Sequence, residues 1–215
     1  MRAWHFLKED MRSGSGSPRK PWVDGVTERY RGELLVPCER GLHSSPTPWD
    51  ALQYAPGPLL SLCEIPDIGP ASIAHGTPTD KHVSRWRRRI VTLDLTRELR
   101  LFACDEAEGA LALALSRGGT VDDRSVLAIA VARRFADGEA TRKELDAAGD
   151  AAWYAARDPA GAAAGAAAGD AAGDAAGAAA RYAARYAAWY AAGAAARERF
   201  NARVEALFRE AGAAI

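Results

Sequence analysis

The stretch CERGLHSSPTPWDALQYA, residues 38–55, contains a glycine turn, a run of small polar residues and the start of a helix. Thr47 is suited to the N-cap because its hydroxyl can accept a hydrogen bond from a free backbone N–H. Pro48 suits the first helical position because proline lacks an N–H, and Asp50 lies three residues after the cap. These residues predict a short helix that ends at the Pro-Gly-Pro sequence following residue 55.

Strand candidates lie on both sides of this helix. They are short apolar runs, most of them bounded by turn residues, and the last begins with the basic run Arg85–Arg89. The four candidates are residues 3–7, 33–36, 59–65 and 85–93. Ten of the eleven prolines also fall in the first hundred residues. The order strand, strand, helix, strand, strand predicts an α+β head domain over residues 1–100.

Residues 101–149 have the pattern of short helices. One is expected from Asp105 to Leu115, before a Gly-Gly pair. A second begins at Asp122 or Asp123, with Leu127, Val131 and Phe135 on one stripe. A third opens with Thr141–Glu144, which has the spacing of a capping box.

Residues 150–215 hold an alanine-rich tetrapeptide repeat and an amphipathic tail. Of twelve consecutive four-residue blocks starting at residue 151, eleven begin with Ala-Ala. Alanine is the best helix former, so residues 159–198 are expected to be one continuous helix after the break at Asp158-Pro159. The expected fold class is therefore an α+β head domain followed by an all-α region with a long alanine-rich helix.

The repeat presents two ridges that favour association with another helix. Five glycines, at positions 161, 165, 169, 173 and 177, form a ridge of small residues, and Tyr182, Tyr186 and Tyr190 form a bulky one. A helix of 40 residues spans about 60 Å, whereas a 100-residue domain has a radius of gyration of about 13 Å. The simpler interpretation is a helix that packs on the rest of the chain or on a copy of itself, and the functional one is a dedicated oligomerisation arm. Self-association through residues 159–198 is the prediction, and a protein partner is a further expectation.

The charge balance and the cysteine content indicate which partners, metals and cellular location to expect. The chain has 28 basic and 28 acidic residues, a balance that disfavours nucleic acids and anionic membranes as generic partners. Three widely spaced cysteines match neither a disulfide framework nor a metal site, so no metal is expected. With no signal-like or membrane-spanning run, the expected location is the cytoplasm.

Two parts of the chain resemble known families. Residues 3–7, the stretch 38–55 and Asp80-Lys81 resemble an N-terminal domain of unknown function from phage and bacterial proteins. Residues 104–145 resemble helical segments of bacterial proteins classed as immunity proteins. Neither resemblance implies an activity.

A shorter segment resembles the ADP-ribosyltransferase superfamily, in its poly(ADP-ribose) polymerase branch. Residues 41–45, followed by a helix carrying a small residue and Tyr54, are similar to that superfamily's second motif. The resemblance implies that His5 holds a ribose of NAD, that His43 and Ser44 line the site, and that Tyr54 stacks on nicotinamide.

The same segment departs from the superfamily at two places. Phe6-Leu7 stands where the superfamily has Gly-Ser or Gly-Thr, and no glutamate is assigned to the third motif. The expected function is therefore that of a non-enzymatic phage or bacterial accessory protein with a ligand- or partner-binding head and a helical assembly region. Its alternative is an ADP-ribosyltransferase-like enzyme that binds NAD. The run Arg85–Arg89 is either a phosphate grip or a solvated strand start.

Overall fold

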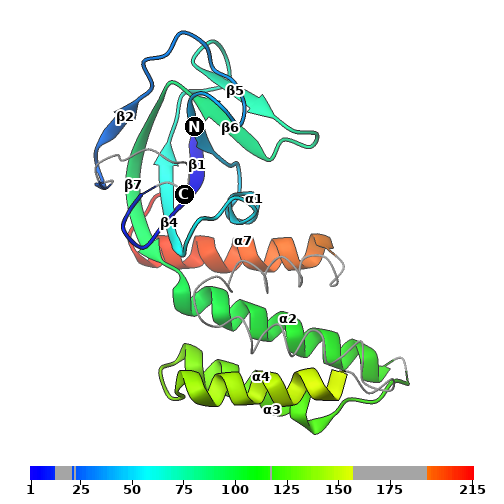
Figure 1. Ribbon diagram of the computed structural model, residues 1–215. Helices are drawn as coiled ribbons and strands as arrows, with labels where there is room; N and C mark the ends of the chain where they lie inside the picture. Colours follow the sequence, from blue (N-terminus) through cyan, green and yellow to red (C-terminus); the bar gives the residue numbers. More distant parts are fainter. Residues whose placement is uncertain (13–20, 22, 117, 157–192) are drawn as a thin grey trace. The chain divides into compact units, whose positions relative to one another are not determined.

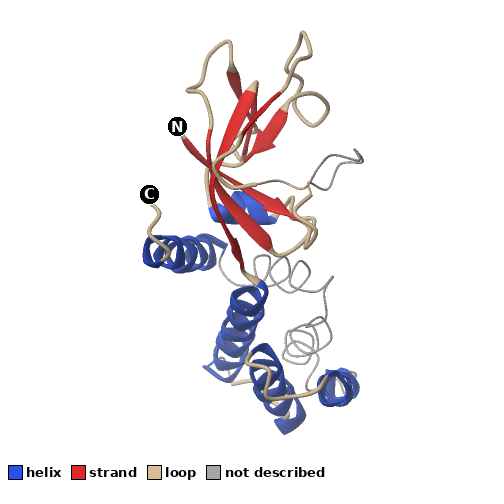
Figure 2. Ribbon diagram, turned by 90° about the vertical axis from the view of Figure 1, so that its left-hand side faces the viewer, coloured by secondary structure: helices blue, strands red, loops and turns tan. Residues whose placement is uncertain are grey.

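The computed structural model describes residues 1–12, 21, 23–116, 118–156 and 193–215. Contacts divide the chain into two compact units (Figures 1 and 2). Residues 1–95 and 199–215 form the first, called here the head unit, and residues 96–198 form the second, called the helical unit. All described strands belong to the head unit, so the class is mixed α+β, as expected.

The head unit contains two antiparallel sheets. The larger has the order β1-β4-β7-β2, made of β1 (Arg2–Leu7), β4 (Leu59–Glu64), β7 (Trp86–Asp94) and β2 (Thr27–Arg29). The smaller has the order β3-β6-β5, made of β3 (Leu42–Ser44), β6 (Lys81–Ser84) and β5 (Ser72–His75). A backbone bridge between Trp4 and Ser45 connects β1 to the end of β3.

Three of the four predicted strands are confirmed, as β1, β4 and β7. The fourth prediction, residues 33–36, is wrong: this segment forms no strand. Arg85 donates hydrogen bonds to the carbonyls of Gly32 and Glu33, so these acceptors bind a side chain rather than a neighbouring strand. Leu34 is 64% exposed, so the apolar run that suggested a strand lacks a buried face.

The predicted helix start at Thr47 is confirmed. Helix α1 (Pro48–Leu52) begins with proline, and the Thr47 hydroxyl accepts a hydrogen bond from the Asp50 N–H at 3.1 Å. The same hydroxyl donates to the Asp50 carboxylate at 2.7 Å. All five residues of α1 are buried. This packing holds the helix in place and thereby positions Tyr54, which follows it.

The C-terminal segment completes the core of the head unit. Helix α7 (Gly193–Glu210) contributes Phe200 and Phe208, which are 1% and 0% exposed. The ring of Phe208 meets that of Trp4 edge to face at 4.9 Å, and Phe200 meets Trp49 at 5.7 Å. Figure 1 shows this part of α7 beside α1 and the lower ends of β1 and β4.

The described part of the helical unit contains α2 (Thr96–Ser116), α3 (Asp123–Ala136) and α4 (Arg142–Ala156). Asp122 caps α3, and Thr141 and Glu144 exchange the two hydrogen bonds of a capping box, both as predicted. Leu127 is 58% exposed, so its predicted place in the buried stripe is wrong. The buried positions of α3 include Ala128 and Ala132, whose small side chains allow the neighbouring helices to pack closely.

The predicted continuous helix over residues 159–198 lies outside the described residues except for its last six, which begin α7. No helix in the described ranges combines the length and apolarity needed to span a bilayer.

The docked C-terminal segment generates a stability prediction. Phe208→Ala should lower the free energy of unfolding of the head unit by about 3–5 kcal/mol, because it removes a fully buried ring and leaves a cavity. Urea denaturation followed by tryptophan fluorescence measures the loss. Leu207→Ala is the matched control, since this neighbour is only half-buried and should cost less. Equal losses in the two variants would contradict the packing described here.

Candidate functional site

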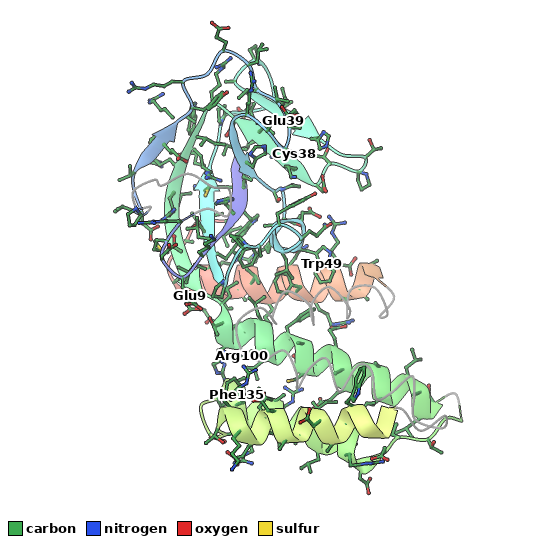
Figure 3. The ribbon with its side chains drawn as sticks, in the orientation of Figure 1. Glu9, Cys38, Glu39, Trp49, Arg100 and Phe135 are labelled. Carbon is green, nitrogen blue, oxygen red and sulfur yellow. The ribbon has the colours of Figure 1, made fainter. Side chains whose placement is uncertain are left out.

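Five polar side chains from separate parts of the head unit meet beside the smaller sheet. Cys38 lies in the turn closed by the bridge between Val36 and Arg40, and Figure 3 shows it next to β6. His43 is the middle residue of β3, and Tyr54 follows α1. Asp80 and Lys81 stand at the start of β6. We call these five residues the Tyr54–Lys81 cluster.

Lys81 occupies the centre of the cluster. Its side chain is largely buried, with 8% of the residue exposed. Its ammonium donates a hydrogen bond to the sulfur of Cys38 at 3.2 Å and lies 3.6 Å from the centroid of the Tyr54 ring. A cation over a tyrosine face is attracted by the ring's quadrupole, so Lys81 and Tyr54 hold each other in place.

Tyr54 is also anchored by its hydroxyl group. The hydroxyl donates to a carboxylate oxygen of Asp80 at 2.6 Å. Burial, this hydrogen bond and the negative charge of Asp80 raise the pKa of Tyr54 to about 12. Tyr54 is therefore a neutral hydrogen-bond donor at physiological pH, while 48% of the residue stays exposed to solvent.

His43 supports the turn that carries Cys38. Its Nε2 accepts a hydrogen bond from the Cys38 backbone N–H at 2.9 Å, so the neutral ring carries its proton on Nδ1. Cys38 has a φ of 67°, in the left-handed region that residues with a side chain seldom adopt. Burial first, then the positive charges of Lys81 and Arg87, lower the pKa of His43 to about 4.

The other two residues of the predicted NAD site lie on β1 and β3. His5 is on β1, where burial and the charges of Arg87 and Arg89 hold its pKa well below the usual range. Ser44 is 3% exposed and follows His43 on the same strand, so the two side chains point to opposite faces of β3. The structure thus brings His43 and Tyr54 to the cluster, with His5 on a nearby strand.

The basic run of β7 is not solvated along its length. Arg87 and Arg89 are 2% and 1% exposed, whereas Arg88 between them is accessible, as the two-residue period of a strand requires. Arg87 donates to the carbonyl of His43 and lies 3.5 Å from the carboxylate of Glu28. Arg87 and Arg89 are internal connections of the head unit, so the expectation of a solvated strand start is wrong for two of the four arginines of the run.

Sequence reasoning did not assign Cys38, Asp80 or Lys81 to a site. Cys38 and Lys81 are 43 positions apart, and only the pairing of β3 with β6 brings their regions together. The available signals were the glycine turn after Cys38 and the Asp80-Lys81 pair, both of which belong to the segments that carry the family resemblance.

Comparisons with known proteins found no matching family model, curated protein or solved structure. The family resemblances of the sequence therefore stay predictions.

The histidines generate a pH prediction. The pKa values of His5, His43 and His82 are all lowered in the folded head, to about 4 for His43, whereas an unfolded histidine has a pKa of about 6.5. Below the pKa of the unfolded histidines, the unfolded chain binds more protons than the folded one. The contribution of the neutral histidines to the free energy of unfolding is therefore fully present above this pKa and is lost as the pH drops toward 4.

Thermal melts of the intact chain between pH 7.5 and pH 5 measure this effect. The melting temperature should decrease steadily below about pH 6.5. His43→Gln, which keeps an acceptor near the Cys38 N–H, should show a shallower decrease. A melting temperature that does not change over this range would contradict the burial of neutral histidines.

Proposed function

We propose that this chain is a non-enzymatic accessory protein of phage or bacterial origin, whose head unit binds a ligand or partner at the Tyr54–Lys81 cluster. The proposed origin rests on the resemblance of residues 3–7, 38–55 and 104–145 to phage and bacterial families. The proposed binding role rests on the cluster.

One observation carries the binding role. A tyrosine whose side chain is about half exposed is held on both its hydroxyl and its ring, by Asp80 and by Lys81. Tyrosine offers a large, amphipathic surface with few rotatable bonds, and a ring that is already fixed loses little entropy when a ligand covers it. Such a ring favours stacking with a planar group.

Besides a planar group, Lys81 favours an anionic group on the ligand. An ammonium has three N–H donors, and among the residues described here its one hydrogen-bond acceptor is the sulfur of Cys38. A ligand that places a carboxylate or phosphate oxygen beside Tyr54 would use the remaining donors. The cluster therefore favours a small molecule with a planar ring and an anionic group, a class that includes nucleotides.

Calorimetric titration of the intact chain with NAD and with AMP tests this role. The wild-type protein should release heat with at least one of them, and Tyr54→Ala should abolish it because the stacking surface is lost. Tyr54→Phe is the matched control, since it keeps the ring and removes only the hydrogen bond to Asp80. Tyr54 is half exposed, so its truncation should change the melting temperature less than Phe208→Ala. Equal binding by wild type and Tyr54→Ala would contradict the proposal.

The second candidate is an ADP-ribosyltransferase-like enzyme that uses NAD. The observation in its favour is the backbone bridge between Trp4 and Ser45, which brings the strand of His5 next to that of His43. This candidate requires release of nicotinamide from NAD, detected by chromatography, and loss of that release in His5→Ala. Heat of binding without nicotinamide release favours the binding role.

The alanine-rich repeat is the proposed assembly region. Its glycine ridge allows close approach of a second helix, its tyrosines add apolar contact area, and zero net charge reduces repulsion between copies. Light scattering at high micromolar concentration should give a mass above that of one chain. Replacing Tyr182, Tyr186 and Tyr190 together by alanine should shift the mass toward the monomer. A strictly monomeric wild-type chain would rule out this part of the proposal.

A further inference from the structure

Cys38 and Lys81 form a pair whose geometry has a chemical consequence beyond ligand binding. The sulfur and the ammonium nitrogen are 3.2 Å apart, and the ammonium donates to the sulfur. Cys38 is exposed, whereas Lys81 is nine-tenths buried beneath the Tyr54 ring. Cys38 therefore combines solvent access with a nitrogen in direct contact with its sulfur.

The other two cysteines lack solvent access. Cys63 and Cys104 are buried, and burial raises the pKa of their thiols to about 11 and about 12. Both therefore stay protonated at neutral pH and are shielded from solutes. They serve as internal controls within the same chain.

We propose that Cys38 and Lys81 form a redox-modification site, in which a hydroperoxide oxidises Cys38 to a sulfenic acid and Lys81 captures it as a sulfenamide cross-link. This inference rests on the sulfur–nitrogen geometry and does not depend on the proposed ligand.

In the first step the Cys38 thiolate attacks an oxygen of hydrogen peroxide. The S–O bond forms while the O–O bond breaks, the sulfur loses two electrons to the peroxide oxygen, and hydroxide leaves. In the second step the Lys81 ammonium gives its proton to that hydroxide, and the free amine attacks the sulfur. The S–N bond forms, the S–O bond breaks, and water leaves. The sum is one thiol, one amine and one hydrogen peroxide giving one sulfenamide and two molecules of water.

The position of Lys81 explains why the amine would capture the sulfenic acid. Its nitrogen already lies against the sulfur, so a bond requires a small movement and no loop closure. A disulfide with Cys63 or Cys104 is disfavoured, because both are buried.

The experiment exposes the reduced, full-length chain to hydrogen peroxide and follows it by intact mass and peptide mapping. The expected product is lighter than the starting protein by two hydrogen atoms. Its digest should contain a peptide joining Cys38 to Lys81, and trypsin should no longer cleave after Lys81. Dithiothreitol should restore the original mass.

Two variants separate the steps. Lys81→Met keeps the chain length of the side chain but lacks the amine, so Cys38 should gain one oxygen and become labelled by a cyclic 1,3-dione, with no cross-link. Cys38→Ser should lose both products. The wild-type result stands by itself if either variant folds poorly, as judged by circular dichroism.

Three results would overturn the proposal. The first is oxidation of Cys63 or Cys104 as fast as that of Cys38. The second is a wild-type sulfenic acid at Cys38 that the dione labels fully while no cross-link forms. The third is a wild-type chain whose mass does not change under peroxide.

Discussion

The buried guanidinium of Arg87 connects the two β-sheets of the head unit. It projects from β7 in the larger sheet, donates to the carbonyl of His43 in the smaller one, and lies 3.5 Å from Glu28 on the neighbouring β2. A buried guanidinium needs such partners because they offset its loss of hydration, so the contacts to His43 and Glu28 stabilise its position. The candidate site depends on this link, since His43 in turn holds the backbone of Cys38.

The C-terminal segment supplies the second constraint on the head. Phe208 and Phe200 pack against Trp4 on β1 and Trp49 in α1, while the Asn201 side chain accepts a hydrogen bond from the Trp49 N–H at 2.9 Å. The residues after the repeat thus belong to the core that the first 95 residues begin. Because α1 is held in this way, the direction of the chain at Tyr54 is fixed by packing rather than by local preference.

The proposed ligand binding and thiol chemistry of the head use the same arrangement. Asp80, just before β6, and Lys81, its first residue, have opposite charges, and both act on Tyr54: Asp80 binds its hydroxyl and Lys81 covers its ring. The ammonium that orients the ring also contacts the sulfur of Cys38. Ligand recognition and thiol chemistry would therefore share Lys81, so that oxidation of Cys38 would withdraw the cation on which the proposed binding depends.

Signals within a few residues of one another determined part of this structure from the sequence alone. Thr47 with Asp50, and Thr141 with Glu144, specify helix starts because their partners are three residues away. The apolar run of β4 likewise specifies a buried strand. The tertiary structure alone decided that residues 33–36 remain a loop, that Arg87 is buried, and that Cys38 meets Lys81. These outcomes depend on pairing between segments 40 or more residues apart, as with His43 and Val83, and no local pattern encodes which segments will meet.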